Sequence, residues 1–414
     1  MRNIIFILIQ IFLFGCSKNS NSEMEIMKTT GSYKIGATRY YFTDDKRPET
    51  FTEKSDDHRE IAIIIWYPTE DITELVKAPY IEKAKERKKL LLKKSPLPPY
   101  FFEKIAKVKS NSFYNAKISD NEEKYPIILF SHGYNAGMSA NSILMEELAS
   151  YGYITISVGY AYETSHFING DGSVKIFSCD NNELIERSVE RRNTLTLQSK
   201  LNDTSDDEEL RFIIREIMDK RPKIMESLNI WVEDTSFIID KLEELNMSDE
   251  LFKGKLDLDK IGVIGHSFGG SVAGQMCITD SRCKAGVNLD GLQIGDMLDK
   301  PLEKPFMFMH HDKENVINIK LNKPFFNQSV NDAYLLVIKG TTHFNLSDLS
   351  LPLYSKLLNP PKEMLGSIDG FRCLKIQNDY IRAFFDKYLS NRKSILLEKE
   401  STDFPEVEIS INLK

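Results

Sequence analysis

The five residues Gly265–Gly269 read Gly-His-Ser-Phe-Gly and carry the strongest chemical signal in the chain. They follow an apolar run, 260–264, and lead into a segment of small residues, 270–274. This order predicts a strand, a sharp turn and a helix, with Ser267 at the apex of the turn. The flanking glycines let the strand and the helix approach closely, and a serine exposed in this way can act as a nucleophile. We therefore expect Ser267 to be catalytic, the alternative being a glycine-rich structural turn.

A serine nucleophile needs a histidine base and an acid that orients the histidine. In α/β-hydrolases these residues follow the serine along the chain in the order acid, then histidine. His343 comes just after the last expected strand of the sheet, where a base could reach Ser267. We expect His343 to be the base, with His310 and His311 as the alternatives.

Two aspartates compete for the role of the acid. Asp290 ends the expected strand 285–289, and Asp312 follows the next expected strand, 305–309. Both positions suit a catalytic acid, and spacing alone leaves the choice open.

The developing negative charge on the substrate needs two backbone N–H donors. The residue after the nucleophile, Phe268, supplies one of them, and the loop after the first parallel strand supplies the other. We expect the second donor to be the N–H of Tyr134. His132 in the same loop is expected to be structural rather than a base.

These residues must be positioned by a sheet, and the pattern of the chain predicts one. Strand and helix patterns alternate from 126 to 390, which favours an α/β-hydrolase fold with a mostly parallel central sheet. Two strand-like runs, 33–42 and 59–67, have no helix between them and predict antiparallel N-terminal edge strands. The expected parts are a hydrolase domain over 32–405, helical inserts at 80–110 and 180–228, and a tail at 406–414.

The N-terminus is typical of an export signal. Arg2 precedes an apolar run, 4–14, which is too short to span a bilayer as a helix but suits a signal-peptide core. The run leads into Leu-Phe-Gly-Cys, which is similar to a bacterial lipobox. We expect residues 1–15 to be removed, Cys16 to be lipidated and 16–31 to be a tether, giving an exported, membrane-anchored lipoprotein that faces the periplasm or the cell surface. The alternative is an ordinary secretory signal.

Composition excludes some partners and leaves others open. The chain has 414 residues, 41% of them hydrophobic, and a net charge of -7, which argues against nucleic-acid binding. Basic residues nevertheless gather in 81–109, which contains ten Lys or Arg and three Glu. This segment either rests on anionic lipid head groups or is a solvated helical hairpin.

The remaining cysteines and histidines bear on disulfides and metals. Cys277 and Cys283 flank a short loop after the expected nucleophile helix, and an exported protein can form disulfides, so we expect these two to pair. The alternative is a small buried Cys277 and a free Cys283. The run 310–312, His-His-Asp, has no second group of ligands at a recognisable spacing, and we expect neither a metal nor another cofactor.

Three stretches resemble the platelet-activating factor acetylhydrolase family, of the lipoprotein-associated phospholipase A2 type; they are 125–133, 257–270 and 284–291. In that family the aspartate closing the third stretch is the catalytic acid, which carries over to Asp290. The stretch 340–343, Gly-Thr-Thr-His, matches the family's base loop. The resemblance spans residues 33–405 and implies hydrolysis of short or oxidised acyl esters of phospholipids.

Two features depart from the family pattern and bear on the choice of substrate. The family often has Asp-His or Glu-His after the second parallel strand, where this chain reads Tyr-Ala-Tyr-Glu, ending at Glu163. The insert 180–228 is also long and highly charged.

The alternative enzyme is a general short-chain carboxylesterase, or a polyester or dienelactone-type hydrolase. The alternative outside enzymes is a ligand-binding surface lipoprotein on a hydrolase scaffold.

Overall fold

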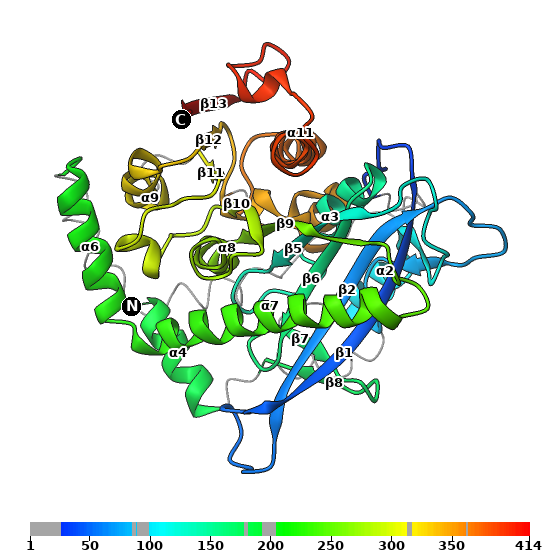
Figure 1. Ribbon diagram of the computed structural model, residues 1–414. Coiled ribbons are helices and arrows are strands. Elements are labelled where there is room, and N and C mark those ends of the chain that lie inside the picture. The colour runs from blue at the N-terminus through cyan, green and yellow to red at the C-terminus, as the bar shows by residue number, and fades with distance from the viewer. Residues whose placement is uncertain are drawn as a thin grey trace.

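An 11-stranded mixed sheet runs through the molecule and has helices on both faces (Figure 1). The computed structural model describes residues 26–84, 88, 99–177, 181–192, 204–312, 317–361 and 363–414. The expected signal peptide and Cys16 lie outside these residues. Among the helices that are described, none combines the length and the apolar character needed to cross a membrane.

Six neighbouring parallel strands form the centre of the sheet. In spatial order they are β6 (Ile154–Tyr160), β5 (Tyr125–Ser131), β9 (Leu256–His266), β10 (Cys283–Leu289), β11 (Phe306–His311) and β12 (Ala333–Ile338). Their near-continuous apolar runs are buried because helices cover both faces. The predicted α/β-hydrolase fold is confirmed, and functional loops are expected at the carboxyl ends of these strands.

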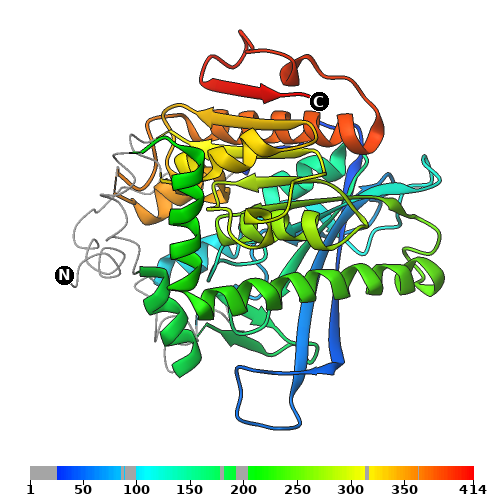
Figure 2. The ribbon, with the colours of Figure 1, turned by 60° about the vertical axis from the view of Figure 1, so that its left-hand side comes forward.

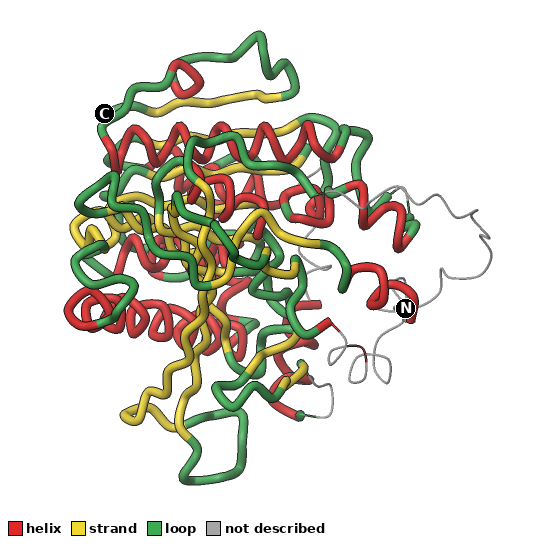
Figure 3. Tube along the Cα trace, turned by 90° about the vertical axis from the view of Figure 1, so that its right-hand side faces the viewer, coloured by secondary structure: helices red, strands yellow, loops and turns green. Residues whose placement is uncertain are grey.

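The N-terminal strands are antiparallel, as predicted, but they are not the edge of the sheet. A long hairpin of β1 (Lys34–Pro48) and β2 (His58–Thr69) joins β6 through β2, and Figure 3 shows it projecting beyond the helices. The sheet continues through β4 (Lys109–Tyr114) to β3 (Lys77–Pro79). Of the helical insert expected at 80–110, the structure describes α2 (Pro99–Ile105), which lies between β3 and β4 in the sequence, while residues 85–87 and 89–98 lie outside the described residues.

The expected C-terminal tail is also wrong, because it contains the other edge strand. β13 (Val407–Asn412) pairs antiparallel with β12. Val407 is buried, and Ile409 and Ile411 pack against the same apolar cluster, so every second residue faces the core. The run 407–411, Val-Glu-Ile-Ser-Ile, alternates apolar and polar residues, which is the pattern of a half-buried strand.

The helices divide between the two faces of the sheet. Side chains of α3 (Ser142–Ser150) and α11 (Gly370–Ser390) belong to the apolar cluster on one face. Those of α6 (Asp207–Asp219), α7 (Pro222–Ser248), α8 (Phe268–Thr279) and α9 (Ile317–Gln328) belong to the cluster on the other face. The 27-residue α7 runs across the molecule in Figure 2. The remaining elements are β7 (His166–Ile168), β8 (Val174–Ile176), α4 (Asn182–Arg192), η2 (Asp296–Leu298), η3 (His343–Leu346), η4 (Asp348–Ser350), α10 (Pro352–Leu358) and η5 (Ile395–Leu397).

The charged insert 180–228 is helical where it is described, and buried polar contacts hold it to the sheet. Arg187 of α4 is only 2% exposed, and its Nε donates to Ser227 Oγ at 2.9 Å. Ser227 in turn donates to Glu163, which follows β6. Glu163 also accepts from Trp231 Nε1 at 2.7 Å. Glu163, which departs from the family pattern, thus anchors α7 over the end of the sheet.

The predicted disulfide between Cys277 and Cys283 is wrong, because both thiols are free and buried. The Cys277 sulfur faces the sheet, where a side chain at Gly286 would approach it to 2.6 Å. Burial raises the pKa of the Cys277 thiol to about 12 and that of Cys283 well above its usual range. Spacing around a loop does not fix the direction of a side chain, and disulfide formation depends on that direction.

Candidate active site

Ser267 lies at a sharp turn between β9 and α8. Its backbone has φ 56° and ψ -120°, a left-handed conformation that is strained for a serine. A Cβ at Gly265 would come within 1.7 Å of Gly269 O, and one at Gly269 within 2.0 Å of Ser131 O. Only glycine fits at both positions, and the turn has the form of a nucleophile elbow with a half-buried serine at its apex.

Asp290 and His343 lie in direct contact beside this turn. His343 Nδ1 is 2.5 Å from Asp290 Oδ2, and Asp290 is completely buried at the end of β10. The other candidate acid, Asp312, accepts the N–H of Gly340 at 3.1 Å instead. Asp312 thereby braces the start of the loop that carries His343, whereas Asp290 contacts the imidazole itself.

The imidazole of His343 also stacks on His266, the residue before Ser267. Their ring centroids are 4.8 Å apart and the rings are inclined by 28°. Burial, together with the nearby His343, lowers the pKa of His266 to about 3, so its ring is neutral. This contact was not predicted from the sequence, although the position of His266 beside the nucleophile is a signal for it. The stacking brings the His343 ring next to the serine turn.

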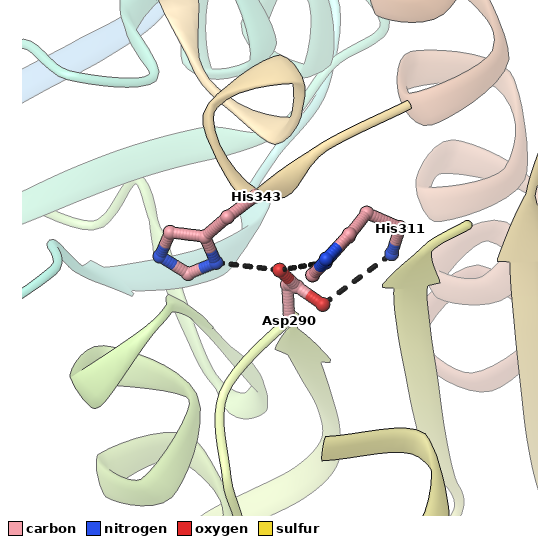
Figure 4. Close-up of side chains that lie close together, drawn as sticks. All are labelled: Asp290, His311 and His343. Carbon is pink, nitrogen blue, oxygen red and sulfur yellow. Dashed lines mark hydrogen bonds and ion pairs between the residues drawn. The ribbon is translucent and has the colours of Figure 1, made fainter. Parts of the chain in front are cut away.

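Two further histidines reach the same carboxylate from the end of β11. His311 Nδ1 is 2.6 Å from Asp290 Oδ2, and the His311 N–H donates to Oδ1 (Figure 4). His310 Nδ1 is 3.3 Å from Oδ1. Although burial alone would raise the pKa of Asp290, hydrogen bonds from His310, His311 and His343 hold it well below its usual range. Asp290 is therefore ionised.

The expected oxyanion donors both lie next to Ser267. Phe268 opens α8, so its N–H is among the unpaired donors at a helix start. Gly133, which precedes Tyr134, packs so closely that a Cβ there would lie 3.2 Å from Ser267 Cβ. His132 is buried with its two ring nitrogens 2.8 Å from Gly133 O and Thr164 Oγ1. Burial lowers the pKa of His132 to about 4, and it holds the loop in shape.

Aromatic side chains form an apolar wall beside the oxyanion loop. Tyr134 stacks on Trp231 of α7 with an angle of 8° between the rings, and Phe268 meets Trp231 edge-on at 5.0 Å. Phe177 meets the Tyr134 ring edge-on. Trp231 is completely buried and Tyr134 is only 7% exposed, so these rings pack behind the expected oxyanion donors. Trp231 was not among the residues predicted from the sequence.

Polar contacts fix the loop that follows His343. Asn345 closes a capping box with Thr342 at the start of η3. Asp348 accepts hydrogen bonds from Ser142 Oγ at 2.7 Å and from the Tyr80 hydroxyl at 2.9 Å. Burial raises the pKa of Asp348 to about 7. These contacts tie the His343 loop to α3 and to the segment around residue 80.

Asp290, His311 and His343 are also residue types that bind transition metals, and their ligand atoms lie within 4.8 Å of one another. Both Nδ1 atoms, however, are only 2.5 and 2.6 Å from one oxygen. Ligands of a tetrahedral zinc ion stand about 3.3 Å apart, so these contacts fit shared protons rather than a metal. The arrangement suits proton transfer through an imidazole.

Comparison with known proteins now identifies the family. Residues 18–400 match the family described as "Platelet-activating factor acetylhydrolase, isoform II". The chain belongs to this family. The resemblance seen in the sequence is thereby confirmed, and the chain is a serine ester hydrolase of the platelet-activating factor acetylhydrolase type.

Individual relatives agree with the family assignment. A platelet-activating factor acetylhydrolase of Canis lupus familiaris is 25% identical over 408 residues, covering 94% of this chain and 84% of the relative. A probable 1-alkyl-2-acetylglycerophosphocholine esterase of Arthroderma benhamiae is 23% identical, covering 68% of this chain and 65% of the relative. The solved structure of a ferulic acid esterase from Streptomyces cinnamoneus superposes with a TM-score of 0.71 at 22% identity, covering 94% of this chain and 99% of that one. This last likeness supports the fold.

Proposed function

We propose that this esterase cleaves short or oxidised acyl esters of phospholipids through an acyl-serine intermediate. The observation that supports it best is the His343–Asp290 pair, which lies beside the serine turn and is joined to it by the stacking of His343 on His266. The family match points to glycerophospholipid esters as the substrate class. Ser267 is the nucleophile, His343 the base and Asp290 the acid of this proposal.

The mechanism uses each of these groups in turn. His343 Nε2 takes the proton of the Ser267 hydroxyl as its oxygen attacks the ester carbonyl. The N–H groups of Phe268 and Tyr134 stabilise the tetrahedral oxyanion. His343 then protonates the leaving lysophospholipid oxygen, and a water molecule activated by His343 cleaves the acyl-serine. Asp290 accepts the Nδ1–H of His343 throughout and balances the charge of the imidazolium.

The acyl-chain preference is tested with a phosphatidylcholine panel that differs only in the sn-2 chain. We expect kcat/KM for the sn-2 acetyl ester to exceed that for the sn-2 palmitoyl ester about 100-fold, because a relative of this chain is named as a probable 1-alkyl-2-acetylglycerophosphocholine esterase. Release of the fatty acid is measured for both esters under the same conditions. Equal rates for both chains would contradict the preference. Hydrolysis of p-nitrophenyl acetate without any phospholipid hydrolysis would favour a general carboxylesterase.

We further propose that the chain is an exported lipoprotein, with residues 1–15 removed, Cys16 lipidated, a tether at 16–31 and the hydrolase domain beyond it. The lipobox-like sequence supports the anchor, and the basic segment 81–109 supports a second, electrostatic contact with anionic lipid. Substituting Cys16→Ser is expected to move the enzyme from the membrane fraction to the soluble fraction at about 0.5 M salt, where charge contacts are screened. Retention of Cys16→Ser on membranes at that salt concentration would contradict lipidation.

A further inference from the structure

One carboxylate oxygen at this site receives two imidazoles. His343 Nδ1 and His311 Nδ1 lie 2.5 and 2.6 Å from the same Oδ2 atom of Asp290. The two rings meet nearly edge-to-face, with centroids 6.2 Å apart and an angle of 70° between them. A serine hydrolase needs only the first of these contacts for catalysis. The contact between His311 and Asp290 is therefore not explained by the catalytic role of His343 alone.

The chain fixes His311 firmly in this position. Its backbone N–H donates to Asp290 Oδ1 at 3.3 Å while its ring contacts Oδ2, so one residue holds both oxygens of the carboxylate. The His311 side chain is only 14% exposed, whereas that of His343 is 33% exposed. His311 therefore approaches the carboxylate from the more buried side and His343 from the more exposed side.

Charge balance shows what this arrangement does. In the transition state His343 becomes a cation, and Asp290 is the buried anion that stabilises it. A neutral His311 donates one hydrogen bond and leaves that negative charge available. A protonated His311 would already neutralise Asp290 and would oppose a second positive charge on His343. One carboxylate can balance only one of the two imidazolium ions.

We propose that His311 is a positioning residue that shares Asp290 with His343 and makes the acid side of the activity profile depend on two imidazoles rather than one. Neutral His311 holds the carboxylate toward His343, and protonation of His311 switches the site off. The inference rests on the proposed role of His343 as the base. It assigns His311 no contact with substrate.

Several titratable groups surround His311. Two of these groups face His311 from other elements. Asp290 does so from the end of β10, and His343 does so from the start of η3. His310, on the same strand as His311, contacts the other carboxylate oxygen of Asp290. Asp312 follows His311 directly, and its carboxylate accepts the Gly340 N–H. Asp290 is the group that couples His311 to His343, because both rings bond to it.

Two substitutions separate the hydrogen bond from the charge. Asparagine at position 311 can place its amide nitrogen where Nδ1 lies and cannot become cationic, whereas leucine removes both properties. We expect His311→Leu to lower kcat about 10-fold at pH 8 with little change in KM. We expect His311→Asn to keep kcat within about threefold at pH 8 and to reduce the acid limb of log kcat/KM against pH from two protons to one.

Proton NMR gives a readout that a merely structural role would not move. Wild-type enzyme should show downfield imidazole N–H resonances of both His311 and His343, and His311→Asn should lose that of His311 while keeping that of His343. Thermal unfolding checks that both variants are folded, and His58→Asn, at an exposed histidine away from the site, is the matched control. An unchanged acid limb in folded His311→Asn would overturn the proposal for His311. Full activity of His343→Ala would instead overturn the proposed base.

Discussion

Replacing Ser267 with alanine is expected to lower kcat/KM for p-nitrophenyl acetate about 10⁵-fold. The substitution removes the oxygen that forms the acyl-enzyme, while the oxyanion donors and the His343–Asp290 pair remain in place. Only the slow attack of water on a bound ester is left. The same variant should no longer react with a fluorophosphonate probe, which labels an activated serine covalently.

Ser248→Ala is a suitable control for this experiment. Ser248 ends α7 and bonds only to the carbonyl of Glu244 one turn earlier among the contacts described for it. The Ser248→Ala variant should keep wild-type turnover and should still be labelled by the fluorophosphonate probe. Turnover within about 10-fold of wild type in folded Ser267→Ala would contradict a nucleophilic role, because loss of such a group removes most of the rate enhancement.

Much of the fold could be predicted because its signals are local. The elbow combines an apolar strand, a serine between glycines and a run of small residues, and the structure shows that glycine is required at both Gly265 and Gly269. The parallel strands are continuous apolar runs, which are recognisable without knowing their neighbours. β4 was missed because it reads Lys-Ser-Asn-Ser-Phe-Tyr, a polar sequence with weak strand propensity.

The contact of His311 with Asp290 could not be predicted, because it depends on the order of strands in the sheet. β10, which ends at Leu289 just before Asp290, lies between β9, which leads to Ser267, and β11, which ends in His311. Asp290 is therefore one strand away from the nucleophile and within reach of both His311 and His343. Asp312 follows β11 and lies one strand farther from Ser267. Spacing along the sequence does not specify which strands are neighbours in the sheet.

The choice between the two aspartates leads to the second large effect. Asp290→Asn is expected to lower kcat about 10⁴-fold with a small change in KM. The amide cannot balance the charge of the His343 imidazolium, and its single oxygen cannot accept from all the imidazoles that now reach the carboxylate. His343 would lose the tautomer that leaves Nε2 free to take the serine proton.

Asp312→Asn is the matched comparison, since it makes the same chemical change one strand away. The amide oxygen of the substituted side chain can still accept the Gly340 N–H, so the base loop should keep its position. We expect kcat within about threefold of wild type, measured at pH 8 for both variants after their folding is checked by circular dichroism. A large loss in Asp312→Asn together with near-normal activity in Asp290→Asn would reverse the assignment of the acid. It would also mean that the short contact between Asp290 and His343 is structural.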